Sequence, residues 1–146
     1  MGGQVVRGEK SGPFKASGQN NDGRLDFFIF DVDYAFWVPL HTHAVQEDTF
    51  FVMDGVLTMQ LDDDVVELTA GDFATAPPGV AHSFTNARAD QGPVRLVNLM
   101  TPGLGFDRYL EQVMAGADEP TTNRLNEEYG VQMMGPPLAV TLGLAS

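Results

Sequence analysis

The sequence predicts an all-β fold, a small barrel or sandwich that carries a C-terminal helical cap. Short apolar segments of strand length, separated by turn residues, follow one another from Leu25 to Met100. After Pro102 the spacing of the apolar residues changes to that of a helix. With 146 residues and no cysteine, the chain fits one domain whose core is held by packing, without disulfides.

Composition divides the chain into three parts. Residues 1–23 are rich in Gly, Ser, Asn and Gln and are expected to form an N-terminal arm, with one short strand at Gln4–Arg7. Residues 24–102 are expected to form the β-barrel. Residues 103–146 are expected to form a C-terminal helical extension that packs on the barrel, because its apolar stripe must cover apolar surface.

The expected strands of the barrel are short apolar runs bounded by Gly, Pro and Asp. They are Leu25–Val32, Ala35–Leu40, Thr49–Met53, Val56–Leu61, Val65–Leu68, Phe73–Ala76, His82–Thr85 and Val94–Met100. Asp54-Gly55 between two of these runs predicts a two-residue hairpin. The acidic run 62–64 is interpreted as a solvated turn at a hairpin tip.

Two helices are expected in the extension. In the segment Phe106–Ala115, one helical stripe contains five large apolar side chains, namely Phe106, Tyr109, Leu110, Val113 and Met114. The segment Thr121–Tyr129 is expected to begin near Thr121 or Thr122, as cap, and to end at Gly130.

Charge excludes several classes of partner. The chain has 20 acidic and 8 basic residues, a net charge of −12, which repels nucleic acids and anionic membranes. Its apolar runs are too short to span a bilayer. The absence of cysteine agrees with a cytoplasmic protein.

The three histidines carry the chemistry. His41 and His43 are two residues apart, so on a strand both side chains leave the same face. The acids Glu47 and Asp48 follow, and His82 begins a later strand. Three imidazoles and a carboxylate suit one divalent transition metal (Fe, Mn, Ni, Cu, Co or Zn) and are a poor cage for Ca or Mg.

These residues fall on two motifs, and through them the sequence resembles the cupin superfamily. The first motif is matched by His41, His43, Asp48 and Gly55; the second is matched by Gly71, Pro77, Gly79, His82 and Asn86. The resemblance covers residues 25–100. It implies a double-stranded β-helix (jelly-roll) barrel with the metal inside, bound by His41, His43, His82 and the motif acid.

The chain departs from these motifs at two positions. Ala35 stands where the family has Gly, and Asp48 stands where it has Glu. The register to Gly55 favours Asp48 as the acid ligand. Glu47 remains the alternative acid, and a site with histidines alone stays open.

Among cupins, the stretch from His41 to Gly55 is similar to small single-domain quercetinase-like proteins. This resemblance implies a dioxygenase that acts on a small, flat, hydrophobic enol or aromatic hydroxyl compound with O2. Asp48 would then be both metal ligand and catalytic base. Two alternatives remain, a non-oxidative metal-dependent isomerase, cyclase or decarboxylase, and a non-catalytic protein that binds a small ligand. Cupins often pair through edge strands, so the resemblance also implies a homodimer, in which the arm would cross to the partner.

Strand parity predicts which side chains surround the site. Phe50 and Val52 share the parity of Asp48, and Phe84 shares that of His82. Phe73 and Thr75, counted back from Pro77, are expected beside them. Asn98 is expected to face inward and therefore to need a polar partner. The predicted substrate pocket thus comprises Phe50, Val52, Phe73, Thr75, Phe84 and Asn98.

Overall fold

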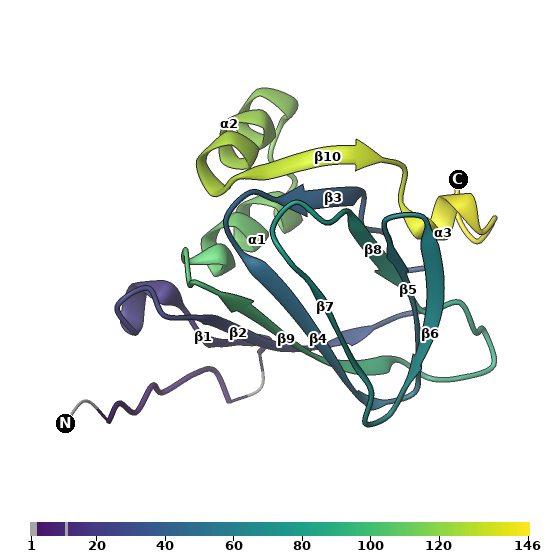
Figure 1. Cartoon of the computed structure of the whole chain (residues 1–146), viewed down its shortest axis with the longest axis horizontal. Helices are drawn as coiled ribbons and strands as arrows, with labels where there is room; N and C mark the ends of the chain where they lie inside the picture. Colours follow the sequence, from purple (N-terminus) through teal and green to yellow (C-terminus); the bar gives the residue numbers. More distant parts are fainter. Residues whose placement is uncertain (1–2, 11) are drawn as a thin grey trace.

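Two five-stranded antiparallel sheets face each other in the computed structural model, which describes residues 3–10 and 12–146 (Figure 1). In spatial order, the first sheet contains β1 (Phe14–Ala16), β2 (Asp26–Val32), β9 (Val94–Thr101), β4 (Glu47–Asp54) and β7 (Phe73–Ala76). The second contains β10 (Val131–Gly135), β3 (Leu40–His43), β8 (His82–Thr85), β5 (Val56–Leu61) and β6 (Asp64–Thr69). The helical elements are η1 (Gly18–Asn20), α1 (Phe106–Met114), α2 (Glu119–Tyr129) and α3 (Leu138–Thr141). The predicted all-β fold with a C-terminal helical part is confirmed.

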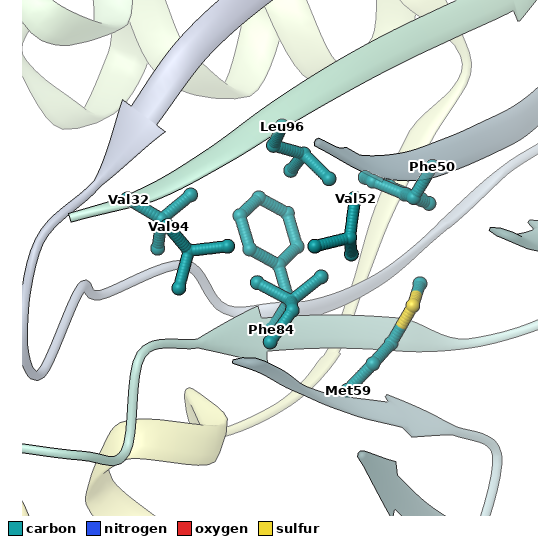
Figure 2. Close-up of a cluster of buried hydrophobic side chains, with 8 residues drawn as sticks. Val32, Phe50, Val52, Met59, Phe84, Val94 and Leu96 are labelled. Carbon is teal, nitrogen blue, oxygen red and sulfur yellow. The ribbon is translucent and has the colours of Figure 1, made fainter. Parts of the chain in front are cut away.

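One end of the barrel is filled by a core of interlocking apolar side chains. Alternate residues of the strands point inward, as the period of two requires. Figure 2 shows the ring of Phe84 among side chains from both sheets; the buried members of this cluster are Val32, Phe50, Val52, Leu57, Met59, Phe84, Val94 and Leu96. This core closes one end of the barrel, so any cavity must lie toward the other end.

The predicted hairpin at Asp54-Gly55 is wrong. β4 and β5 flank this dipeptide but belong to different sheets, β4 pairing with β9 and β7, and β5 with β6 and β8. Gly55 adopts φ +90°, a conformation that lets the chain turn sharply from one sheet to the other. The dipeptide therefore marks a corner of the barrel, because local turn chemistry does not specify which strand becomes the neighbour.

The predicted strand Ala35–Leu40 is also wrong, since only Leu40 belongs to β3. Ala35 adopts φ +60°, outside the range of a strand, and Pro39 has no N–H to donate to a ladder. The segment instead bridges the two sheets as a loop. The positive φ of Ala35 also explains physically why glycine suits this motif position.

Ala35→Gly is expected to stabilise the fold by up to about 1 kcal/mol, because glycine adopts the left-handed conformation without steric cost. The free energy of unfolding from urea titration measures this effect. Ala44→Gly is the matched control: Ala44 lies at an exposed bend and is not among the described residues with positive φ. Its replacement should lower stability slightly by loosening the unfolded chain. Equal destabilisation by both replacements would contradict the argument.

A segment near each end of the chain forms an edge strand of one sheet. The predicted strand at Gln4–Arg7 is wrong; the strand of the arm is β1, where Phe14 pairs with Phe28 of β2. At the other end, β10 was not expected at all. It pairs with β3, Val131 opposite His43 and Met133 opposite His41. The C-terminal extension is therefore more than a helical cap, because it is part of the sheet that carries all three histidines.

The helices gather at the end of the barrel opposite the Phe84 core, except α3, which packs on β8 (Figure 1). The second predicted helix begins earlier than expected, because Asp118 caps α2 by accepting a hydrogen bond from the Thr121 N–H at 2.9 Å. A second apolar cluster joins α1, α2 and β10 to the barrel through Phe28, Met100, Phe106, Tyr109, Leu125, Tyr129 and Val131. Within the described ranges, no helix has the length and apolar character of a membrane span.

The carboxylate of Asp26 fixes α1 to the barrel. Asp26 is fully buried on β2 and accepts hydrogen bonds from the backbone N–H groups of Leu104, Gly105 and Phe106 at 3.0–3.1 Å. It also accepts one from Gly18 N–H at 2.7 Å and one from the side-chain amide of Gln46 at 3.1 Å. A negative charge at the first turn of a helix satisfies its free N–H groups and its dipole. One buried side chain thus connects η1, α1 and the loop before β4.

Candidate metal centre

The two sheets bring the three histidines and Asp48 together inside the barrel. His41 and His43 leave the same face of β3, and His41 is paired directly with His82 of β8. Asp48 reaches them from β4, in the facing sheet. One ligand atom from each of the four side chains lies within 4.8 Å of the others, and all four residues are buried. Side chains separated by up to 41 positions in the chain are therefore close enough to hold one ion.

Backbone carbonyls fix two of the imidazole rings. His41 Nδ1–H donates to the carbonyl of Pro39 at 2.7 Å, and His82 Nδ1–H donates to that of Val80 at 3.0 Å. A neutral ring that carries its proton on Nδ1 presents a lone pair at Nε2. Each ring is thus oriented with an Nε2 lone pair, which is the arrangement that metal-ligating histidines use.

The donor set of this cluster fits a cation. His82 Nε2 lies 3.0 Å from Asp48 Oδ2, so two acceptors face each other unless a proton or a cation lies between them. In the described part of the chain, neither ring nitrogen of His43 has a hydrogen-bond partner, although both are buried. His43 Nε2 also lies 3.2 Å from the same carboxylate oxygen. A buried polar atom without a partner is costly, and a metal ion at the centre of the cluster would satisfy His43 Nε2.

The electrostatics of the cluster keep His41 and Asp48 in their ligating forms. Burial, together with the neighbouring rings of His82 and His43, lowers the pKa of His41 to about 3, so this ring is neutral at pH 7. Burial alone would raise the pKa of Asp48, but its contacts with His43 and His82 outweigh burial and hold that pKa below its usual value. A neutral imidazole and an ionised carboxylate are the forms that bind a metal.

The structure places Asp48, and not Glu47, in the cluster. Consecutive residues of β4 point to opposite faces, and Glu47 points outward, where its Oε2 accepts a hydrogen bond from Thr75 Oγ1 at 2.6 Å. The two acids therefore have different surroundings despite their adjacency. Glu47 is not positioned to replace Asp48 as a ligand.

Asn98 holds the second oxygen of the Asp48 carboxylate. Its amide donates to Asp48 Oδ1 and to the carbonyl of Thr49 at 3.1 Å, from β9. The buried polar side chain expected at this position therefore has its partner in Asp48. With Oδ1 held by Asn98, Oδ2 is the oxygen that faces the imidazoles.

Asn98→Ala is expected to weaken metal binding by about 10- to 100-fold, because groups that orient a ligand have effects of this size. Calorimetric titration of the metal-free protein with Co²⁺ measures the change. Thr75→Val serves as the control, since it removes a hydroxyl that bonds Glu47 on the outer face of the same sheet. If the affinities of the Asn98→Ala variant and the wild type agree within threefold, Asn98 does not position Asp48.

A cavity of about 200 Å³ opens onto the cluster from the helical end of the barrel. Its walls are almost entirely apolar; seven of the lining residues are phenylalanines: Phe14, Phe28, Phe30, Phe36, Phe50, Phe84 and Phe106. The remaining apolar lining is Pro13, Val38, Met100, Leu110 and Met114, and the polar lining is Asp31, His41, His43, Asp48 and Asn98. Three of the four candidate ligands, His41, His43 and Asp48, thus line an otherwise mostly apolar pocket.

Comparison with known proteins assigns the family. The family described as Cupin domain matches residues 28–100, which include all four clustered side chains. The chain belongs to the cupin family. Both expected motifs of this cupin lie within the matched region, and the double-stranded barrel is the fold that its relatives share.

Its relatives include a curated enzyme and several solved structures. Over 103 residues, 70% of this cupin, it is 26% identical to quercetin 2,3-dioxygenase of Bacillus subtilis, of which it spans only 30%. A double-stranded β-helix protein from Klebsiella pneumoniae superposes with a TM-score of 0.54 at 23% identity, over 68% of this chain and 85% of that one. A putative sugar phosphate isomerase from Acidithiobacillus ferrooxidans gives a TM-score of 0.51 at 17% identity, over 63% and 68% of the two chains. The two structures show the fold alone.

Three of the predicted pocket residues lie elsewhere in this cupin. Phe50, Phe84 and Asn98 line the cavity as expected, whereas Val52 is fully buried in the Phe84 core and does not reach it. Phe73 is 66% exposed, and Thr75 bonds Glu47 on the outer face. In β7 the inward residues are Ala74 and Ala76, which pair with Phe50 and Asp48. The count back from Pro77 failed for Phe73 and Thr75 because Pro77 lies beyond the end of β7 and does not share the alternation of the strand.

Several lining residues escaped sequence reasoning. Phe28 and Phe30 lie in β2, where residues 27–30 are all apolar and their alternation gives no sign of which face is inward. Phe106, Leu110 and Met114 occupy one face of α1 at a spacing of four. The sequence predicts that this stripe packs on the barrel. It does not show that the stripe lies over the candidate metal site and not over the apolar core.

Proposed function

We propose that this cupin binds one divalent transition metal through His41, His43, Asp48 and His82, and acts as a dioxygenase. The proposed substrate is a small, flat, hydrophobic enol or aromatic hydroxyl compound, and O2 is the second substrate. The observation that carries the proposal is the position of the His/Asp cluster at the end of a phenylalanine-lined cavity. The distant similarity to quercetin 2,3-dioxygenase supports the same reaction class.

The pocket favours an uncharged substrate. Among the described residues that line it, none is Lys or Arg, and the charged groups are the carboxylates of Asp31 and Asp48. A phosphate group would find no cationic partner there, so the pocket is poorly suited to phosphorylated sugars. Phenylalanine side chains instead offer flat apolar surfaces against which an aromatic ring can stack.

The protein's own groups would prepare the substrate. The phenylalanines would orient its ring and exclude bulk water, which strengthens electrostatic interactions in the pocket. Asp48 would accept the proton of the substrate hydroxyl at Oδ1, where Asn98 fixes the carboxylate. When bound, the metal would supply Lewis-acid and redox chemistry for the reaction of the substrate with O2, both atoms of which enter the product of a dioxygenase.

Oxygen uptake tests the proposal. The protein, loaded separately with Fe²⁺, Mn²⁺, Co²⁺, Ni²⁺, Cu²⁺ or Zn²⁺, is mixed with a panel of flavonols and small enols, and O2 consumption is compared with product formation. We expect equal consumption of O2 and substrate with at least one metal, and loss of turnover in His82→Ala. Substrate conversion without O2 consumption would instead identify a non-oxidative isomerase, cyclase or decarboxylase. Tight binding without conversion would identify a ligand-binding protein.

A further inference from the structure

His43 is held differently from the other two imidazoles of the cluster. The Nδ1 atoms of His41 and His82 each have a backbone carbonyl as partner, at 2.7 and 3.0 Å respectively. In the described part of the chain, His43 Nδ1 has no hydrogen-bond partner, although it is buried. No hydrogen bond in this part of the chain therefore fixes the orientation of the His43 ring.

Backbone contacts fix the position of His43 but not the angle of its ring. His43 pairs with Val131 across β3 and β10, and its carbonyl accepts a hydrogen bond from the Gly79 N–H at 2.9 Å. The torsion about the Cβ–Cγ bond stays open, because an imidazole has broad preferences there. Since the lone pair of Nε2 lies in the plane of the ring, this torsion decides whether Nε2 faces the cluster.

Phe106 contacts this ring from α1. The two ring centroids are 5.4 Å apart and the ring planes meet at 80°, the edge-to-face arrangement that aromatic pairs favour. Among the described side chains, Phe106 is the aromatic neighbour of His43 that is not itself a candidate ligand. It is the first residue of α1 and lies outside the region 28–100 that matches the cupin family.

Phe106 is itself firmly held. Its N–H donates to the buried carboxylate of Asp26 at 3.1 Å, which fixes the start of α1. Its ring stacks on that of Tyr109 with the centroids 4.6 Å apart, and it meets the ring of Tyr129 edge-on at 6.0 Å. Tyr109 in turn donates a hydrogen bond to Asn126 of α2 at 2.6 Å. A side chain fixed by packing in this way can restrict the ring that it contacts.

We propose that Phe106 is a positioning residue for His43, and that it restricts the His43 ring to the plane in which Nε2 faces the other candidate ligands. His43 Nε2 lies 3.2 Å from Asp48 Oδ2 and therefore points into the cluster. A ligand that is already oriented loses less freedom when it binds. The consequence for metal binding rests on the proposed function, whereas the consequence for the ring can be measured without metal.

Ring motion in the metal-free full chain tests the proposal directly. NMR relaxation of the ring ¹³C–¹H groups gives an order parameter for each imidazole, which is about 0.85 for a rigid group. We expect Phe106→Leu to lower the order parameter of His43. The values for His41 and His82 should not change, because their rings have carbonyl partners. An unchanged order parameter for His43 would overturn the proposal.

Phe28→Leu is the matched control for this measurement. Phe28 belongs to the same apolar cluster as Phe106 and is fully buried, so the same atoms are removed from the same core. Its aromatic partner is Phe14, at 5.7 Å. Circular dichroism verifies that each variant is folded, and Phe106→Met provides a second test variant that keeps an apolar side chain. Equal loosening of His43 in Phe28→Leu would also overturn the proposal.

Co²⁺ provides a second readout. We expect Phe106→Leu to bind Co²⁺ about 10-fold more weakly than the wild type and to change the ligand-field absorption of the bound ion, whereas Phe28→Leu should alter neither. The spectrum separates positioning from a loss of stability, because it depends on the arrangement of the ligands. Unchanged affinity and spectrum in Phe106→Leu would overturn the proposal. A wild-type protein that takes up no Co²⁺ would contradict the proposed function, and the ring measurements would still decide the role of Phe106.

Discussion

Asp48→Asn is expected to lower the affinity for Co²⁺ by at least about 100-fold, more than the loss of a group that only orients a ligand. Asp48 supplies the anionic ligand among three neutral imidazoles, so its replacement removes both a strong bond and the charge that offsets the ion. Calorimetric titration of the metal-free protein measures the loss. Glu47→Gln is a closely matched control, since it removes the adjacent acid, which points away from the cluster.

The same variant should behave differently without metal. Asparagine has the shape of aspartate, and its amide can donate to the Nε2 lone pair of His82, where the carboxylate offers a second acceptor at 3.0 Å. In a chelator, we therefore expect Asp48→Asn to melt at a temperature equal to or above that of the wild type. Loss of affinity with a retained melting temperature identifies a ligand. Metal affinity within threefold of the wild type would contradict the assignment, and a large drop in melting temperature would indicate a structural role.

Asp26→Asn is expected to destabilise the fold by about 3–5 kcal/mol, because hydrogen bonds to a buried charge are strong and a donor without a partner is costly. The Asp26 carboxylate accepts five hydrogen bonds, three of them from the start of α1. An asparagine amide would turn an N–H group toward donors that now face an oxygen. The free energy of unfolding from urea titration measures the effect.

Asp31→Asn provides the comparison for this prediction. Asp31 lies on the same strand but is exposed, and its ion pair with Arg95 has side chains about half exposed. Such a pair contributes less than about 1 kcal/mol. Because α1 places Phe106 and Leu110 in the lining of the cavity, Asp26→Asn should also weaken the binding of a hydrophobic probe. Asp31→Asn should leave the position of α1 unchanged and so should not weaken probe binding in this way. An Asp26→Asn variant within 1 kcal/mol of the wild type would show that α1 docks by apolar contacts alone.

Local patterns in the sequence were sufficient for the fold class and for the histidines. A spacing of two places His41 and His43 on one face of any strand. The motif glycines Gly55 and Gly79 adopt a positive φ, which glycine tolerates in turns. The register between Asp48 and Gly55 correctly indicated which acid turns inward. These features depend on a few consecutive residues, so they are visible without knowledge of the partner strands.

Pairing between distant segments decided the rest. The partners of β4 are β7 and β9 and not the next strand in sequence, so Asp54-Gly55 forms a corner between the two sheets. The inward positions of β7 follow from its pairing with Asp48 and Phe50, which a count back from Pro77 does not reveal. Likewise, β10 is a strand because β3 offers an edge to it.

The sequence by itself therefore indicated an all-β cupin barrel, and it identified the three histidines and a neighbouring acid, Asp48 or Glu47, as candidate metal ligands. Only the tertiary structure decided that Asn98 holds Asp48, that Asp26 anchors α1, and that phenylalanines from both sheets and α1 enclose the pocket. The physical reason is that periodicity fixes the face on which a side chain lies within its own strand or helix. The contacts between such faces depend on long-range packing and buried hydrogen bonds, for which neighbouring residues carry no signal.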